Sequence, residues 1–238
     1  MKKLLVAAIA AGLVGTVNAQ SAFEGGFGQL GIGYQNVSPS VSNVTISGSA
    51  GGTTLTNFPL SSSVGSSSDF TGTATIGYNF GISKDFLLGI GAEYSPLASN
   101  SSNVTANYGP DSAGAGYRAT TTFKIENSYN IFISPGIVID KDKLAYAKVG
   151  YTGASAKTAG QTLNLNGYSL GLGYKQMISG GWYGFGEVNY ASYGNQNLST
   201  SYNSVVTVGG TNYNVPTTAK ATVSANTMNV IVGVGYRF

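Results

Sequence analysis

Apolar residues alternate with small or polar residues along most of this chain, and this period of two is what most constrains its fold. In FTGTATIGYNF (70–80), Phe70, Ile76 and Phe80 share one face, while threonine, glycine and asparagine share the other. Such alternation is typical of a β-strand, because successive side chains point to opposite sides. We count eight such segments, near residues 23–36, 69–80, 86–96, 117–138, 144–153, 162–177, 182–193 and 222–238.

The connections between these segments alternate in length. Short turns with the sequences GISKD, DKDK and ISGG follow the second, fourth and sixth segments. Long polar connections cover about 37–68, 97–116 and 194–221, and a shorter one, about 154–161, lies on the same side. Short turns at one end and long loops at the other are typical of outer-membrane barrels. We therefore predict an all-β fold: an eight-stranded antiparallel up-and-down transmembrane β-barrel with both termini on the short-turn side.

Two of the long connections contain hairpin signals. SVVTVGGTNYNV (204–215) has two alternating runs around Gly209-Gly210, which fits a two-residue turn. NVTISGSAGGTTLTNF (43–58) is similar. The strands therefore either continue beyond the membrane as an extracellular β extension or give way to disordered serine-rich loops, and the sequence leaves both possibilities open.

The first nineteen residues have the parts of a secretory signal peptide. Lys2 and Lys3 precede an apolar run from Leu4 to about Val14, and small residues lead to Ala19. The run is too short to span a bilayer as an anchor. We expect residues 1–19 to be cleaved and residues 20–238 to form the barrel in the outer membrane of a Gram-negative bacterium. The chain has no cysteine, which excludes a lipoprotein anchor and disulfides.

Charge is scarce. Only 9% of the residues are charged, against about 25% in an ordinary soluble domain. After removal of the signal peptide, ten basic and nine acidic residues remain. This balance gives no reason to expect a nucleic-acid partner.

The charges within predicted strands fall opposite the apolar face wherever the alternation is clear. A lysine or arginine on the lipid face of a barrel costs about 2–4 kcal/mol at mid-membrane, and an unpaired ion inside the barrel is also costly. We therefore predict a paired polar network in the lumen, which either holds the barrel shut or lines an ion path. Its predicted members are Glu93, Lys124, Glu126, Lys148, Lys175, Glu187 and Arg237.

Aromatic residues lie near the ends of the predicted strands. Rings with a polar group favour both membrane interfaces, so these positions predict an aromatic belt. Phe80, Phe86 and Trp182 belong to the short-turn end, and Tyr94 and Tyr190 lie toward the loops.

The last strand ends on a bare phenylalanine. Its predicted lipid face carries Val230, Val232, Val234, Tyr236 and Phe238. This ending resembles the C-terminal signature of bacterial outer-membrane proteins, which the barrel-assembly machinery recognises. The whole mature chain is similar to the small eight-stranded barrels: the OmpA transmembrane domain, OmpX, OmpW and the opacity proteins. We expect it to depart from the OmpA type, in which a peptidoglycan-binding domain follows the barrel.

Two motifs that suggest other functions lack their context. GFGQLG (26–31) matches a dinucleotide fingerprint, but strand pattern continues where a helix is needed. GYSLG (167–171) matches a nucleophile elbow around Ser169, which requires a histidine that this chain does not contain. Outer-membrane proteases, deacylases and palmitoyl transferases resemble one another in using histidine, so we predict no enzyme, no cofactor and no metal.

Two functional hypotheses follow. The chain is either a structural or adhesin-like surface protein that acts through its long loops, or a small porin-like channel for ions or small solutes. The expected partners are outer-membrane lipids and lipopolysaccharide, the assembly machinery during biogenesis, and a host or matrix ligand of the loops.

Overall fold

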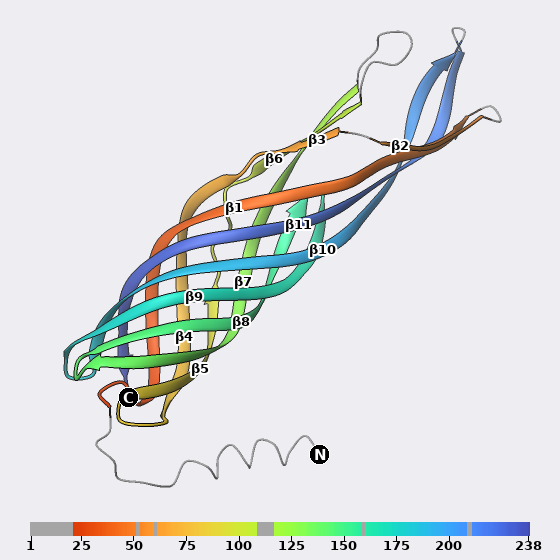
Figure 1. Ribbon diagram of the computed structural model, residues 1–238. Helices are drawn as coiled ribbons and strands as arrows, with labels where there is room; N and C mark the ends of the chain where they lie inside the picture. The colour runs from red at the N-terminus through yellow and green to blue at the C-terminus, as the bar shows by residue number, and fades with distance from the viewer. Residues whose placement is uncertain (1–20, 51–52, 60, 109–116, 159, 209–210) are drawn as a thin grey trace.

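The computed structural model describes residues 21–50, 53–59, 61–108, 117–158, 160–208 and 211–238 (Figure 1). These residues form eleven strands. None of the described residues forms a helix long and apolar enough to cross a membrane. The strands are β1 (Gly25–Ala50), β2 (Thr53–Pro59), β3 (Ser61–Val64), β4 (Ser67–Gly81), β5 (Phe86–Ser95), β6 (Ser102–Tyr108), β7 (Tyr117–Asp140), β8 (Lys143–Thr158), β9 (Gln161–Ser179), β10 (Trp182–Val208) and β11 (Thr211–Arg237).

Eight of these strands close into a ring. Each pairs antiparallel with its neighbour in the order β1, β4, β5, β7, β8, β9, β10 and β11. Pairing of β1 with β11, from Phe27 opposite Arg237 onward, closes the barrel and removes the free edges there. The predicted fold class, an eight-stranded antiparallel up-and-down barrel, is confirmed. Figure 1 shows the C-terminus at the same end as the tight turns, which we call the turn end; the opposite end is the loop end.

The outer wall of the barrel is apolar. Side chains such as Leu30, Ile32, Leu172 and Val232 are exposed because they point away from the lumen. A ring of aromatic side chains, the loop-side girdle, borders this band at one end: Tyr34, Phe70, Tyr94, Tyr129, Tyr151, Tyr168 and Tyr190. A second ring, the turn-side girdle, borders it at the other: Tyr78, Phe80, Phe86, Tyr174, Trp182, Tyr236 and Phe238.

The spacing of the girdles fits a bilayer. Phe86 and Tyr94 mark the two girdles on β5 and are eight residues apart. At about 3.3 Å per residue and a tilt of about 40°, the band between them is roughly 20 Å high, close to the apolar band of outer-membrane barrels.

A β-bulge in β7 changes which residues face the lumen. Glu126 pairs with Ser155 and Tyr129 with Gly153, so β7 advances three residues where β8 advances two. Asn127 has a φ of 52°, the left-handed conformation that asparagine tolerates better than most residues. As a result, Phe123 and Ile125 point into the barrel and are buried, whereas Tyr129 points outward. Regular strand alternation alone would place these three residues on one face, and the bulge puts Phe123 and Ile125 on the opposite face from Tyr129.

Strands extend well beyond the loop-side girdle. The β10–β11 ladder continues to Val208 opposite Thr211, and β1 pairs with β2 as far as Ala50 opposite Thr53. These strands form the projecting arm of Figure 1, whose four-stranded sheet, in the order β2, β1, β11 and β10, we call the extension sheet. The described residues of the two connections with hairpin signals, 43–58 and 204–215, therefore lie in strands that continue beyond the girdle, which is the first of the two alternatives.

Several strands are longer than predicted. Residues near 154–161, which we expected to form a loop, mostly belong to β8 and β9. The connections 37–68 and 97–116 contain β2, β3 and β6, and β6 pairs with the upper part of β7. The expected signal peptide, residues 1–19, lies outside the described residues.

Candidate functional site

A buried cluster of three charges crosses the barrel lumen. The Lys148 Nζ lies 2.9 Å from Glu93 Oε2 and 2.9 Å from Glu187 Oε2. These residues come from β8, β5 and β10, so the two ion pairs connect distant parts of the wall. The side chains of Lys148 and Glu187 are each 2% exposed, which removes both charges from solvent. Such a pair is stable only if further hydrogen bonds satisfy the remaining polar atoms.

Neutral groups supply those hydrogen bonds. The Tyr146 hydroxyl and the Gln29 amide donate to Glu187 Oε1, and Asn189 donates to Oε2 over 3.1 Å. The Thr75 hydroxyl donates to Glu93 over 3.2 Å. We call these residues together with Lys148, Glu93 and Glu187 the ion cluster. Each acidic side chain therefore has both an ionic and a neutral partner, as a closed polar network requires.

Lys175 lies nearer the turn end and contacts aromatic rings. Its Nζ is 4.0 Å from the ring centre of Phe27, 4.9 Å from Tyr183 and 5.0 Å from Tyr146. Ring faces attract a cation, and the attraction is stronger away from water. Phe23, Leu144, Phe185 and Ile231 complete a buried apolar layer around these rings.

Glycine makes room for the rings inside the lumen. A Cβ at Gly173 would lie 2.3 Å from the Tyr146 ring, and one at Gly235 would lie 2.3 Å from the Tyr183 ring. Any larger residue at these inward positions would collide with the ring of its paired residue on the neighbouring strand, since Gly173 pairs with Tyr146 and Gly235 with Tyr183. Part of the high glycine content, 35 residues, therefore reflects how tightly the lumen is filled.

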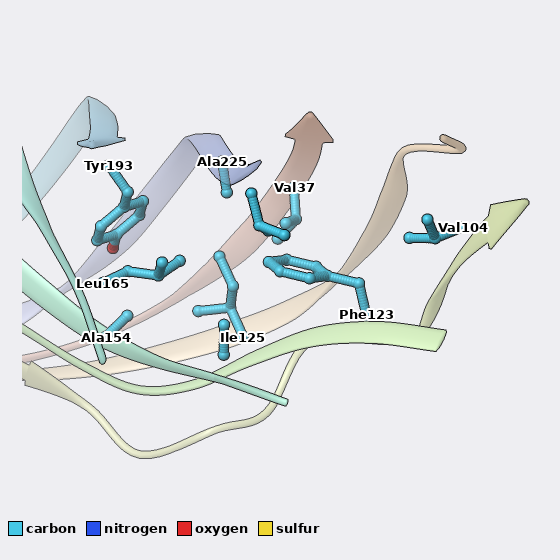
Figure 2. Close-up of a cluster of buried hydrophobic side chains, with 10 residues drawn as sticks. Val37, Val104, Phe123, Ile125, Ala154, Leu165, Tyr193 and Ala225 are labelled. Atoms are coloured by element: carbon cyan, nitrogen blue, oxygen red, sulfur yellow. The ribbon is translucent and has the colours of Figure 1, made fainter. Parts of the chain in front are cut away.

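The upper lumen holds a small polar cavity below an apolar plug. The cavity, about 40 Å³, is lined by side chains that include Thr73, Ser95, Asn130, Thr152 and Thr227. Above it, Figure 2 shows Val37, Phe123, Ile125, Leu165 and Tyr193 pointing toward one another from different strands. Within the described part of the chain, side chains thus fill the lumen both above and below the cavity.

The structure distributes the seven residues of the predicted lumen network over four locations. Glu93, Lys148 and Glu187 meet in the ion cluster, and Lys175 lies among the rings. Arg237 is at the turn-end rim, where its Nη1 donates to the backbone carbonyl of Glu24 over 3.2 Å.

Lys124 and Glu126 require a correction. They occupy the face of β7 opposite the buried Phe123 and Ile125, so they lie on the outer wall above the bulge and not in the lumen. There Glu126 forms one ion pair with Lys124 and another with Lys157, a residue that we had expected in the connection near 154–161.

Sequence reasoning also missed the neutral members of the ion cluster. Tyr146 and Gln29 carry no charge, and only charged residues were considered for the lumen. The signal was present, because Tyr146 has the same strand parity as Lys148 and therefore the same inward face.

The C-terminal residues and the belt residues lie on the outer wall. Val230, Val232 and Val234 are each about half exposed, and Phe238 is 78% exposed. Trp182, Tyr236 and Phe238 form a run of edge-to-face rings, with centres 5.2 and 5.5 Å apart. Phe86, Tyr94 and Tyr190 are exposed in the girdles, as is part of Phe80. Recognition of this ending by an assembly machinery stays a prediction.

Solved structures resemble this barrel. Outer membrane protein OprG from Pseudomonas aeruginosa superposes with a TM-score of 0.54 at 14% identity, over 93% of this chain and 99% of that one. The chain has the fold of a small outer-membrane β-barrel. The attachment invasion locus protein Ail of Yersinia pestis gives a TM-score of 0.39 at 15% identity, covering 90% of this chain and 99% of that one. The protease OmpT from Escherichia coli gives 0.46 at 11%, covering 94% and 100%.

The likeness to OprG shows the fold alone, because the identity is low. No family model and no curated protein matches the sequence. Among the described residues, no group of three or more histidine, cysteine, aspartate or glutamate side chains could hold a metal ion.

Proposed function

We propose that this chain is a non-enzymatic outer-membrane protein that acts at the cell surface through its extension sheet, while its filled lumen stabilises the barrel. The observation that carries this proposal is the contrast between the two parts of the molecule. The lumen is occupied by the ion cluster, the rings around Lys175 and the apolar plug. The strands of the extension sheet, by contrast, continue far beyond the girdle.

The extension sheet is large enough to be a binding surface. From Tyr190 in the loop-side girdle to its end at Val208, β10 runs eighteen residues, roughly 60 Å of strand. This part of β10 contains no charged residue, and the facing part of β11 contains one, Lys220, which lies opposite Ser199. A rigid barrel that presents such a sheet fits a binding role, as function often lies in segments that a rigid scaffold positions.

A channel is the competing function, and the polar cavity favours it. Its threonine, serine and asparagine lining would suit water or a small ion. However, a cavity of about 40 Å³ holds only a few water molecules, and filled layers border it on both sides. The proposal therefore gives the lumen a structural role.

A shortened extension sheet tests the surface role. Leu198 and Ala221 are paired across β10 and β11, so replacing residues 199–220 with Asn-Gly closes the hairpin with a two-residue turn. Bacteria that display the full chain should adhere to surfaces coated with fibronectin or laminin, and the shortened variant should not. Heat-modifiable gel mobility checks that both barrels fold. Equal adhesion of the two variants, or adhesion no greater than that of cells without the protein, would overturn the surface role.

A further inference from the structure

Three charged side chains lie together on the outer wall, just beyond the loop-side girdle. Lys124 of β7 and Lys157 of β8 are directly opposite in the strand register. Glu126 joins them, with its Oε1 2.6 Å from Lys157 Nζ and its Oε2 3.6 Å from Lys124 Nζ. The lysine side chains are 37% and 49% exposed, so both ammonium groups remain accessible.

The height of this cluster matches the polar region of a membrane. On the same strands, Tyr129 and Tyr151 belong to the loop-side girdle. With about 3.3 Å per residue and a tilt of about 40°, Lys124 lies about 10 Å and Lys157 about 15 Å above those rings. Beyond an aromatic girdle come the charged headgroups of the outer leaflet.

The bulge at Asn127 determines that β7 presents charge at this height. Without the extra residue, Lys124 and Glu126 would point into the lumen, and Phe123 and Ile125 would point outward. On β8, Lys157 reaches the outer wall without a bulge, because it keeps the parity of Tyr151. Two strands with different local geometry thus place their lysines side by side where the apolar band has ended.

The cluster has unused capacity for an anion. Two ammonium groups share one carboxylate, which leaves a net charge of one positive unit. Each ammonium has three N–H donors and, among the residues that the structure describes, makes one ion pair, so donors remain for a further ligand. Glu126 also holds the two ammonium groups close together. A tetrahedral phosphate can accept from both at once.

We propose that Lys124 and Lys157 bind a phosphate group of lipopolysaccharide in the outer leaflet, with Glu126 as the residue that positions the two ammonium groups. The site rests on the placement of the barrel in the outer membrane, and it does not depend on what the extension sheet binds. It gives the barrel a fixed lipid contact on the β7–β8 side.

The experiment measures lipid A binding to the refolded mature protein in zwitterionic detergent. Bisphosphorylated lipid A is titrated against the natural protein and a Lys124→Gln/Lys157→Gln variant, in parallel with lipid A lacking both phosphates. The matched control is Lys84→Gln/Lys141→Gln, which removes the same charge from two turns at the other end of the barrel. Heat-modifiable mobility shows that each variant is folded.

The proposal predicts that the outer-wall variant binds bisphosphorylated lipid A about tenfold more weakly, equivalent to about 1.4 kcal/mol, and that the turn variant binds normally. High salt should weaken the natural interaction, since the lysines are partly exposed. Equal binding by the natural protein and the outer-wall variant would overturn the proposal, as would equal binding of lipid A with and without phosphate. Neither result bears on the adhesion experiment, so the two proposals fail separately.

Discussion

Lys148 Nζ lies 2.9 Å from Glu187 Oε2 across the lumen, and both side chains are only 2% exposed. The pair joins β8 to β10, and the second pair of Lys148, with Glu93, adds β5. A single ammonium thus links three of the eight wall strands. Removing it would leave two carboxylates without their common counterion.

We predict that Lys148→Met destabilises the barrel by about 3–5 kcal/mol, because it leaves buried charge unpaired. The triple variant Glu93→Gln/Lys148→Met/Glu187→Gln should recover most of that loss, since the two carboxylates that lose Lys148 as their counterion are then neutral as well. Urea unfolding in lipid vesicles, followed by Trp182 fluorescence, measures both. Lys84→Met, in an exposed turn, is the control and should leave the free energy of unfolding unchanged. If Lys148→Met also left it unchanged, the ion cluster would not stabilise the fold.

The inward glycines give a second prediction. Gly173→Ala should destabilise by about 1–3 kcal/mol, because the added methyl meets the Tyr146 ring. Gly186→Ala is the matched control: the nearest neighbouring atom to its Cβ would be 4.0 Å away, the backbone oxygen of Ile231. The same unfolding assay compares them. Equal stability of the two variants would contradict the filled lumen.

The bulge residue gives a third prediction. Asn127 has a positive φ, and a β-branched residue pays about 1–2 kcal/mol for that conformation. Asn127→Val should therefore destabilise clearly more than Asn127→Gly. Both variants lose the hydrogen bond that the Tyr94 hydroxyl donates to the Asn127 side chain, so their difference isolates the backbone effect. Equal loss in the two variants would mean that the bulge is absent in the membrane.

Trp182 gives a fourth prediction, because it is the one tryptophan of the chain. It is half exposed on the outer wall in the turn-side girdle, so it should lie at the membrane interface. Lipids brominated near the headgroup should quench its fluorescence more than lipids brominated at the chain ends. Stronger quenching by lipids brominated at the chain ends would mean that Trp182 lies in the centre of the bilayer, which contradicts its place in an interfacial girdle.

Much of the fold could be predicted because a barrel wall obeys one simple rule. Inward and outward side chains alternate, so the lipid-facing runs of β4, β5 and β11 could be read directly from the sequence. The same rule hid the bulge. Odd-numbered residues are apolar on both sides of Asn127, from Phe123 to Ile133, so the alternation looks unbroken although the apolar face switches from lumen to lipid.

The candidate site was harder to predict than the fold. Because charge is scarce, the few charged residues within strands were the candidates for the lumen, but their pairing depends on the register between strands distant in sequence. Lys175 shows the difficulty, since three rings from β1, β8 and β10 surround it and no local pattern indicates that. Lys157 shows it again, because the strand that carries it was predicted to end before it.

Single-channel conductance of the refolded mature protein in planar bilayers tests the central claim, a lumen closed by side chains, most directly. Folding is verified first by heat-modifiable gel mobility, and Lys148→Gln and Glu187→Gln variants are recorded beside the natural protein. The account predicts no steady current steps from the natural protein. Steady steps whose size changes with either substitution would show that ions pass the ion cluster, and the channel function would replace the one proposed here.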